Sequence, residues 1–334
     1  MSNNTQSIAV FGAGSWGTAL SMQLARNGHN VRLWGHNPAH ILTLQQSRKN
    51  DQYLPGITLF DNIQPMSDVQ ACLAKVDYVL IVIPSKAFRP FLQSIRPYLA
   101  EGVPVFWASK GFEIETGKLM HELVAEELPG HSCGVLSGPT FAKEVAQGLP
   151  AAITCAGSDA VITEQFAELM HGNRFRCYTS KDVIGVELGG ALKNVLAIAV
   201  GAADGLGFGA NTRAALMTRG LSEIMRLGQA MGARQETLMG LAGLGDLILT
   251  CTDDQSRNRR FGLAIGQGKS IEQAEIDVQQ TVEGLRAAKA IYQMMKERSL
   301  DLPIMTQVYR VLYEQVPPAE AVESLESRPL RAEV

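Results

Sequence analysis

Val10-Phe11-Gly12-Ala13-Gly14-Ser15-Trp16-Gly17 is the stretch that decides the fold of this chain. It carries the glycine spacing GxGxxG between a short apolar run and an amphipathic stretch over residues 15–27. That context is what a dinucleotide-binding turn requires, although a tight strand-to-helix turn without a ligand has the same outline. Gly12 permits the turn, Gly14 lets backbone N–H groups approach a pyrophosphate, and Gly17 lets the helix pack against the strand. The pattern predicts a nucleotide site at the start of the helix.

Outward from this turn, the two halves of the chain have different periodicities. The first half alternates amphipathic stretches with β-rich runs, and a continuously apolar run such as 78–83 is typical of a strand buried on both faces of a parallel sheet. The expected strands are 7–11, 30–34, 77–83, 103–108, 133–137, 151–155 and 175–178. From about Lys181 apolar residues recur every three to four positions. We therefore expect an α/β Rossmann-like domain over 1–180 and an all-α substrate-binding and catalytic domain over 181–334.

Composition excludes several classes of protein. With 46% hydrophobic and 19% charged residues the chain reads as an ordinary globular protein, and a net charge of -3 gives no global attraction to nucleic acid or to an anionic membrane. Its five cysteines lack a CxxC pair and its six histidines lack zinc-ligand spacing, which indicates reduced thiols and no metal. The longest apolar window, 183–203, contains charged residues and predicts a buried helix without membrane insertion. With no signal-peptide pattern at the N-terminus, we expect a cytoplasmic protein.

The end of the second expected strand bears on the choice of cofactor. A dinucleotide fingerprint usually has an acid there that bonds the adenosine ribose, whereas this chain reads Leu33-Trp34-Gly35-His36-Asn37. Because a carboxylate would repel a 2′-phosphate, its absence removes the main barrier to NADP. Arg32 and His36 are candidate donors, although an arginine on a strand is often solvated. We expect NADP to be accepted, alongside NAD.

Two loops after strands are candidates for the ligand crevice. The strand at 103–108 runs into Ser109-Lys110-Gly111, and ligands of open α/β sheets bind beyond the carboxyl ends of strands. Lys110 is therefore expected to point towards the cofactor, with a solvated loop lysine as the alternative. The next strand ends in the loop 137–143, whose backbone N–H groups could line the same crevice; the alternative there is a plain turn.

Lys193 is the most unusual charged residue of the sequence. The residues on its helical face, 186, 189, 190, 196, 197 and 200, are Val, Gly, Gly, Leu, Ala and Val. Desolvation disfavours an ammonium group, and a second cation such as Lys110 would act in the same direction. A lysine tuned towards neutrality can serve as a general acid and base. The alternative is a lysine whose stem crosses apolar surface while its head reaches water.

Two further stretches in the second half carry polar groups that suit a phosphorylated substrate. Asp246, in Gly-Leu-Gly-Asp-Leu, either caps a helix or orients a lysine or a substrate hydroxyl. Residues 256–260 read Ser-Arg-Asn-Arg-Arg, and arginine binds phosphate bidentately. The alternatives are a solvated basic run or a nucleic-acid patch, and the absence of interleaved aromatic residues disfavours the patch.

These motifs occur together and in order. They are GxGxWG at 12–17, SKG at 109–111, SGPT at 137–140, LKN at 192–194, DGLGFGANTRAA at 204–215, GLGDL at 243–247 and SRNR at 256–259. The set closely resembles the bacterial NAD(P)-dependent glycerol-3-phosphate dehydrogenases over nearly the whole chain, to about residue 315. One departure is Gly35, because relatives often carry arginine beside His36.

The resemblance implies reversible hydride transfer between dihydroxyacetone phosphate and sn-glycerol 3-phosphate, feeding phospholipid synthesis. It also implies a helical domain similar to that of 6-phosphogluconate dehydrogenases, and a homodimer through the helical half. The implied catalytic residues are Lys193, Lys110 and Asp246. The implied cofactor contacts are Gly12, Gly14, Ser15, Trp16, Gly17, His36, Lys110, Ala142, Arg257 and Glu283. The implied substrate contacts are Lys110, Gly138, Thr140, Lys193, Asp246, Ser256, Arg257 and Asn258.

Two rival functions are compatible with parts of the sequence. Another two-domain dehydrogenase could act on a hydroxy acid or a sugar acid, but a phosphate pocket at 256–260 would disfavour an unphosphorylated substrate. A nucleotide-binding protein without chemistry would keep the glycine turn but has no need for both Lys110 and Lys193.

Overall fold

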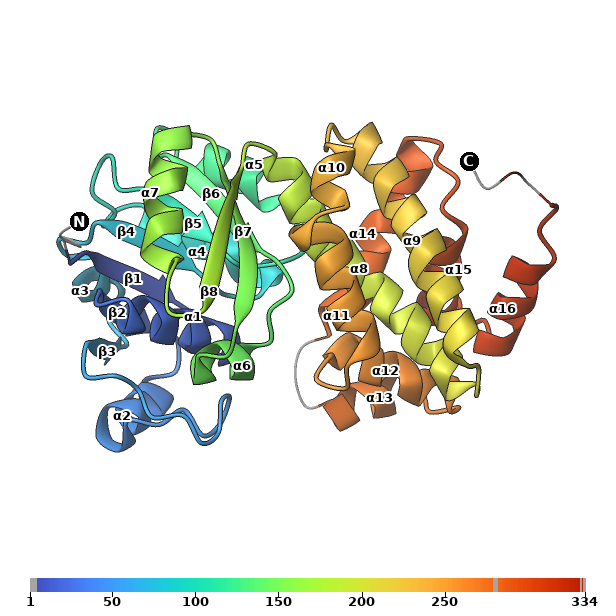
Figure 1. The fold of residues 1–334 in the computed structure, drawn as a ribbon, viewed down its shortest axis with the longest axis horizontal. Helices are drawn as coiled ribbons and strands as arrows, with labels where there is room; N and C mark the ends of the chain where they lie inside the picture. Colours follow the sequence, from blue (N-terminus) through green and yellow to red (C-terminus); the bar gives the residue numbers. More distant parts are fainter. Residues whose placement is uncertain (1–4, 279–281, 331, 333–334) are drawn as a thin grey trace. The chain divides into compact units, whose positions relative to one another are not determined.

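The computed structural model describes residues 5–278, 282–330 and 332, and the chain divides into two compact units (Figure 1). Unit 1 comprises Met1–Glu113 and Lys118–Glu187, and unit 2 comprises Ile114–Gly117 and Leu188–Val334. The division falls inside helix α8 (Val183–Gly205), a few residues beyond the expected boundary at 180.

Unit 1 contains one eight-stranded sheet with the order β3-β2-β1-β4-β5-β6-β7-β8. Its strands are β1 (Ser7–Phe11), β2 (Asn30–Trp34), β3 (Ile63–Met66), β4 (Tyr78–Ile81), β5 (Val105–Trp107), β6 (Cys133–Ser137), β7 (Ala151–Gly157) and β8 (Phe175–Ser180). All neighbouring pairs are parallel except β6 and β7, which are antiparallel. The strand order reverses direction between β1 and β4, and in open α/β sheets ligands bind at such a switch point.

Two features of the sheet differ from the sequence prediction. Strand β3 was not expected, because it is only four residues long and contains Pro65. Proline is tolerated there because β3 is an edge strand that pairs only with β2. The expectation of a parallel sheet is wrong for β7 and β8, which are parallel to each other and run opposite to the other six strands, because the apolar pattern does not record strand direction.

Helices cover both faces of the sheet in unit 1 (Figure 1). Helices α1 (Ser15–Arg26), α6 (Ala142–Gln147) and α7 (Ala160–Met170) contribute to one core with alternate strand residues such as Ile8 and Val10. On the other face Phe11 meets Trp34 and Phe91, from β2 and helix α4 (Phe88–Ile95). Alternating side chains along β1 therefore fill two separate layers. The remaining elements of unit 1 are α2 (Pro38–Ser47), α3 (Val69–Leu73), η1 (Ser85–Ala87) and α5 (Met120–Glu127).

All the regular secondary structure among the described residues of unit 2 is helical. After α8 come α9 (Ala210–Ala230), α10 (Gln235–Leu238), η2 (Leu241–Gly245), α11 (Asp246–Thr252), α12 (Arg257–Gly266), α13 (Ile271–Val278), α14 (Glu283–Glu297), α15 (Pro303–Tyr313) and α16 (Pro318–Glu326). Helix α8 is long and apolar enough to cross a membrane by composition, but 83% of its most apolar window is buried inside the protein. A central helix that is apolar all round is typical of a globular core.

The expected helix over 271–298 is two helices, α13 and α14, and residues 279–281 between them lie outside the described part. The tail after Pro317, expected to be loosely held, instead forms α16. Its start has a physical cause, because Pro318 occupies the first helical turn, where a missing N–H costs nothing.

Glycines let α8 and α12 approach until backbone meets backbone. A Cβ at Gly201 of α8 would lie 2.1 Å from the Arg259 carbonyl oxygen, and one at Gly262 of α12 would lie 2.1 Å from that of Ile198. Gly205 and Gly266 make the same kind of contact one turn further on. Only glycine fits at these positions, so the sequence fixes the spacing of the two helices.

We predict that Gly201→Ala destabilises the protein by about 1–3 kcal/mol, because the methyl group forces the helices apart. Helix propensity alone predicts the opposite sign, a gain of up to about 1 kcal/mol. Guanidinium unfolding measures the difference. The control is Gly220→Ala in α9, where the nearest atoms to the added Cβ belong to the Leu196 side chain and not to backbone. A Gly201→Ala protein as stable as wild type would contradict the close contact.

Candidate active site

The glycine turn has the geometry that its sequence predicts. Gly12 has a φ of +126°, and a Cβ there would lie 2.2 Å from the Val82 carbonyl oxygen. A Cβ at Gly17 would lie 1.8 Å from the Gly12 carbonyl oxygen, whereas one at Gly14 meets nothing within 4 Å. Gly12 and Gly17 are therefore required by the fold itself. Gly14 instead leaves open space at the first turn of α1, which suits the approach of a ligand.

Polar groups beside this turn fit a bound dinucleotide. No side chain caps the N-terminus of α1, so its first N–H groups remain available to an anion. Among the described residues the buried Trp16 Nε1 and Ser137 Oγ have no hydrogen-bond partner. Buried polar groups rarely stay unpaired, so these two are candidates for hydrogen bonds to a polar ligand. Ser15 differs, since its hydroxyl donates to the Tyr53 carbonyl oxygen at 2.6 Å.

Residues at the end of β2 are the candidates for contact with the adenosine ribose of a bound dinucleotide. The Arg32 guanidinium donates to the carbonyl oxygens of Cys72 and Ala71, at 3.2 and 3.3 Å, and also to that of Ala74. Arg32 thus caps the end of α3 through its Nη1 atom. His36 is exposed. At Gly35 a Cβ would lie 2.7 Å from the end of the Ile41 side chain, so a larger residue needs that side chain to move.

The carboxyl ends of the parallel strands place the loop residues at one edge of the sheet. Lys110 follows β5 and is half-buried, and Ser109 beside it donates to the Ile83 carbonyl oxygen at 2.7 Å, which ties the ends of β5 and β4 together. Gly138 and Thr140 follow β6, where the Thr140 hydroxyl donates to the Gly138 carbonyl oxygen at 3.2 Å. Ala142 is the first residue of α6 and packs against the core.

A buried carboxylate that the sequence analysis did not single out lies in the first turns of α8. Glu187 Oε1 accepts hydrogen bonds from Trp107 Nε1 at 3.1 Å and from the backbone N–H of His121 at 3.0 Å. Its Oε2 lies 2.5 Å from His121 Nδ1. The signal available in the sequence was a single acid in an apolar helix, but its partners lie 80 and 66 residues away.

Burial and pairing have opposite effects on these two groups. Burial raises the pKa of the Glu187 carboxyl, and the hydrogen bonds and charge of His121 limit that rise. Burial lowers the pKa of His121, but the bond to Glu187 and its charge outweigh this and raise the pKa overall. The pair fastens the start of α8 to Trp107, the last residue of the strand that runs into Lys110.

Lys193 lies on α8 with only 8% of its surface exposed, and its ammonium group donates to Asp246 Oδ1. Asp246 is 1% exposed and also accepts from the Thr250 hydroxyl at 3.4 Å. An opposite charge in direct contact offsets part of the cost of burying the ammonium group. Asp246 was interpreted either as a helix cap or as the partner of a lysine. The structure has it bonded to Lys193, and the N-cap of α11 is Gly245.

The local fold brings this pair together by close packing. A Cβ at Gly189 of α8 would lie 2.3 Å from the Ala242 carbonyl oxygen and 3.0 Å from Gly243 Cα. Both residues belong to η2, a single turn of π-helix that leads directly into Asp246. Such wide turns are rare and are frequent at functional sites. Gly189 therefore allows η2 to lie against α8 at the level where Lys193 can reach Asp246.

The residues 256–258 lie at the start of α12. The buried Ser256 caps the helix by accepting from the Arg259 N–H at 3.2 Å. The amide of Asn258 is bonded at both ends, donating to Asn194 Oδ1 at 2.9 Å and accepting from the Gly284 N–H at 2.9 Å. This amide chain joins the residue after Lys193 to the start of α14. Asn258 thus links α8, α12 and α14.

Arg257 and Glu283 are electrostatic neighbours. Arg257 is solvent-accessible, yet the surrounding protein lowers the pKa of its guanidinium by desolvation; Glu283 opposes that shift and Arg260 adds to it. Arg259, the second arginine of the run 257–260, pairs with Asp204 at 2.6 Å and with Asp254. Arg257 and Arg260 remain as the candidates. No cluster that could hold a metal ion occurs among the described residues.

Comparison with known proteins assigns the family. The N-terminal model of NAD-dependent glycerol-3-phosphate dehydrogenase matches residues 7–162, and the C-terminal model matches 182–323. A glycerol-3-phosphate dehydrogenase (NAD(P)+) of Thioalkalivibrio sulfidiphilus is 53% identical over 327 residues, 98% of each chain. One of Shewanella halifaxensis is 50% identical over 332 residues, 99% of this chain and 98% of the relative.

This chain belongs to the NAD-dependent glycerol-3-phosphate dehydrogenase family. The crystal structure of glycerol-3-phosphate dehydrogenase from Coxiella burnetii superposes with a TM-score of 0.94 at 44% identity, covering 97% of this chain and 99% of that one. A ketopantoate reductase from Ralstonia eutropha has a TM-score of 0.59 at 16% identity over 95% of this chain and 99% of its own, and shares the fold alone. The Rossmann-like and helical architecture predicted from the sequence is confirmed.

We predict that Gly14→Ala and Gly17→Ala separate binding from folding. Gly14→Ala keeps the stability of the apo protein but weakens NADPH binding, because its methyl group enters the open space at the start of α1. Gly17→Ala lowers the free energy of unfolding by about 1–3 kcal/mol, because its methyl group overlaps a carbonyl oxygen. Fluorescence titration and urea unfolding measure the two quantities. Equal effects of both variants on stability would contradict this assignment.

We predict that the Glu187–His121 pair makes stability fall as pH rises through the range near neutrality. The folded protein raises the pKa of both groups, so it binds protons that the unfolded chain releases. That contribution is complete below the unfolded pKa values and is lost as pH rises through the folded ones. Urea unfolding of wild type and His121→Gln at several pH values gives the difference. Parallel curves for the two proteins would refute the coupling.

Proposed function

We propose that this protein catalyses the reversible NAD(P)H-dependent reduction of dihydroxyacetone phosphate to sn-glycerol 3-phosphate. The observation that carries this function is the family match, which extends over 98% of the chain at 53% identity to a curated glycerol-3-phosphate dehydrogenase. As a member of that family the chain is an oxidoreductase that uses NAD or NADP. The bound nicotinamide supplies the hydride.

In this proposal Lys193 is the general acid and base at the C2 oxygen of the substrate. Hydride addition to a ketone builds negative charge on oxygen, and a nearby cation stabilises that charge before a proton is transferred. Support comes from the burial of Lys193 and from Asp246, which fixes the direction of its ammonium group. Lys110 is proposed to contact both cofactor and substrate, in keeping with its place after β5.

The phosphate group of the substrate is proposed to meet the start of α12. Arg257 would bind it bidentately, and Ser256 and Asn258 would hold the loop and complete the contact. Gly138 and Thr140 would line the substrate from the loop after β6. Binding a phosphate away from the reacting carbon orients the substrate, since binding energy gained at a remote group can be used for positioning.

The cofactor is proposed to lie on the glycine turn. Its contacts would be Gly12, Gly14, Ser15, Trp16 and Gly17 around the pyrophosphate, with His36 near the adenosine ribose. Ala142, Arg257 and Glu283 are proposed as further contacts. Because no carboxylate follows β2 and Arg32 is bonded elsewhere, His36 would be the main donor available to a 2′-phosphate. We therefore expect both NADPH and NADH to be accepted.

The biological setting is proposed from the family likeness. The protein would act in the cytoplasm, without insertion into a membrane, and would supply glycerol 3-phosphate to phospholipid synthesis. We propose that it forms a homodimer through the helical unit. Support comes from large apolar side chains that unit 2 leaves more than a third exposed, among them Phe208, Met239 and Ile248.

We predict that dihydroxyacetone phosphate drives NAD(P)H oxidation while dihydroxyacetone does not, because only the phosphorylated ketone engages Arg257. Absorbance at 340 nm with each ketone, in NADH and in NADPH, measures both the phosphate requirement and the cofactor preference. Equal rates of NAD(P)H oxidation with the two ketones would contradict the phosphate-site assignment.

We predict that Lys193→Met lowers kcat by about 10²–10⁴-fold, the usual contribution of a general acid or base. NADPH binding, followed by fluorescence, should be retained. Lys289→Met, at an exposed position of α14, is the control and should keep wild-type kcat. Substantial activity in Lys193→Met that still folds would refute the catalytic role.

A further inference from the structure

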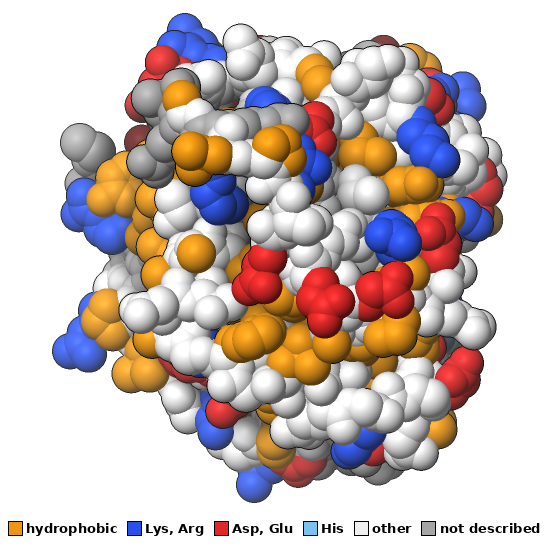
Figure 2. Space-filling view, turned by 90° about the vertical axis from the view of Figure 1, so that its right-hand side faces the viewer, with side chains coloured by type: hydrophobic (Ala, Val, Ile, Leu, Met, Phe, Trp, Pro, Cys, Tyr) orange, Lys and Arg blue, Asp and Glu red, His pale blue; other side chains and the backbone are white. Residues whose placement is uncertain are grey.

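A cavity of about 610 Å³ lies within the helical unit and contains none of the residues proposed for catalysis. Its volume falls in the range of about 300–1,000 Å³ that is usual for small-molecule sites. It is formed by α8, α9, α15 and α16, together with residues just after α16. On this side of unit 2 apolar side chains gather at the surface between charged ones (Figure 2).

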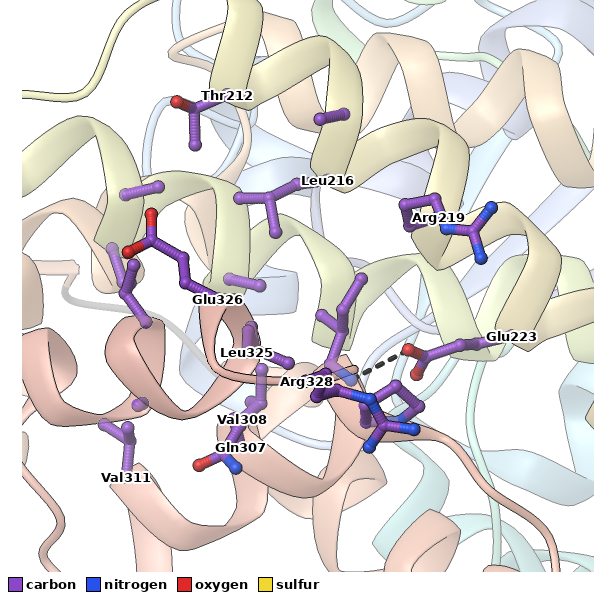
Figure 3. A pocket seen from close by; sticks show the side chains of 18 of the residues that line it. Thr212, Leu216, Arg219, Glu223, Gln307, Val308, Val311, Leu325, Glu326 and Arg328 are labelled. Carbon is purple, nitrogen blue, oxygen red and sulfur yellow. Dashed lines mark hydrogen bonds between the residues drawn. The ribbon is translucent and has the colours of Figure 1, made fainter. Parts of the chain in front are cut away.

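The walls of the cavity are apolar along most of their length. They include Ala202 and Leu206 of α8, Leu216 of α9, Val308 and Val311 of α15, and Leu325 of α16. Residues 212, 216, 219 and 223 follow one face of α9, so a single helix runs along the whole cavity (Figure 3). Walls of this kind suit a hydrocarbon chain and offer few partners to a sugar or a nucleotide.

Charged groups lie at the two ends of this lining. Glu326 lies near Thr212 at one end, and Arg219, Glu223 and Arg328 lie towards the other (Figure 3). Arg226 and Asp301 also line the second end, so its three arginines face two carboxylates and leave a formal excess of one positive charge. An anionic group would be favoured there and disfavoured beside Glu326.

Most of the charged side chains at the cationic end already make an ion pair or hydrogen bonds within the protein. Arg328 pairs with Asp301 Oδ2 at 2.5 Å, and Arg226 donates to the Asp301 carbonyl oxygen. Glu223 accepts from the N–H groups of Ile304 and Met305, at 2.8 and 3.0 Å. Within the described residues no hydrogen bond or ion pair occupies the guanidinium of Arg219. It is the donor left for a ligand at this end.

Glu223 makes this end more positive than its formal charges suggest. Burial raises the pKa of its carboxyl to about 7, despite the two backbone N–H groups and Arg226, which lower it. Near neutral pH a fraction of the molecules therefore carries a neutral Glu223. This adds to the preference for an anion beside Arg219.

We propose that this cavity binds a single-chain anionic amphiphile, with its alkyl chain along the apolar walls and its acidic head at Arg219. A second copy of the chain is the competing occupant, but a flat partner surface would leave a cavity of this volume unfilled. The proposal goes beyond the dehydrogenase activity and does not depend on any residue assigned to it.

Isothermal titration of the full chain tests the class of ligand. Laurate and dodecyl phosphate should each bind at one site per chain, while dodecyltrimethylammonium, with the opposite charge, should not. Decanoate should bind on the order of tenfold more weakly than laurate, because each methylene contributes about fourfold. Tighter binding of laurate points to a carboxylic acid as the natural ligand, and tighter binding of dodecyl phosphate points to a phosphate-headed lipid.

Matched variants test the location. Ala215 lines the cavity and Ala214 beside it does not, although both are exposed on α9. Ala215→Trp should abolish laurate binding and Ala214→Trp should leave it unchanged. Arg219→Gln should weaken binding about tenfold or more, as expected for loss of a charge-assisted hydrogen bond. Arg234→Gln, elsewhere on the surface of the same unit, should have no effect.

Three results would overturn the proposal. The first is an affinity for the alkyl ligands that does not depend on their chain length. The second is equal laurate binding by Ala215→Trp and Ala214→Trp. The third, measured by sedimentation velocity of each variant, is a dimer that excludes laurate and is split by Ala215→Trp, which would identify the cavity as part of an interface between two copies.

Discussion

The buried ion pair between Lys193 and Asp246 is the interaction on which the helical unit depends. Each side chain alone would carry an uncompensated charge into an apolar interior, at a cost of several kcal/mol. Together they offset each other, and Asp246 keeps Thr250 as a second partner. Because the two residues are 53 positions apart, the pair constrains how α8, η2 and α11 pack. A shift of any of these elements would leave a charge buried without its partner.

Small residues make that packing possible. Gly189 lets η2 touch the backbone of α8, and the glycines shared by α8 and α12 place the start of α12 beside Asn194. Lys193 and the proposed phosphate-binding residues are thus positioned by backbone contacts, which are stiffer than contacts between long side chains. The apolar character of α8 follows from the same requirement, since polar side chains would need partners that the close packing excludes.

The sequence predicted those features that depend on local geometry. Side chains three, four and seven positions apart share a helical face, so the apolar surroundings of Lys193 could be read from the sequence. The glycine turn could also be recognised from the sequence, because the GxGxxG spacing is local, although Gly12 packs against the distant Val82 carbonyl. Its geometry agrees with the separate roles given to Gly12, Gly14 and Gly17.

The features that the sequence did not predict depend on distant partners. The sequence analysis did not single out Glu187, because its partners Trp107 and His121 are recognisable only in the folded chain. The use of Arg32 as a cap for α3 and of Arg259 as a partner of Asp204 was hidden for the same reason. The direction of β7 is not encoded in its apolar pattern, since a buried strand has the same pattern whichever way it runs.

A double-mutant cycle on the buried pair tests the central claim most directly. Lys193→Met and Asp246→Leu should each lower the free energy of unfolding by about 3–5 kcal/mol, since each leaves one buried charge unpaired. The double variant removes both charges, and should be destabilised by clearly less than the sum of the two single changes. If the two effects simply add, within about 0.5 kcal/mol, the two side chains do not interact in the folded protein and the account is contradicted.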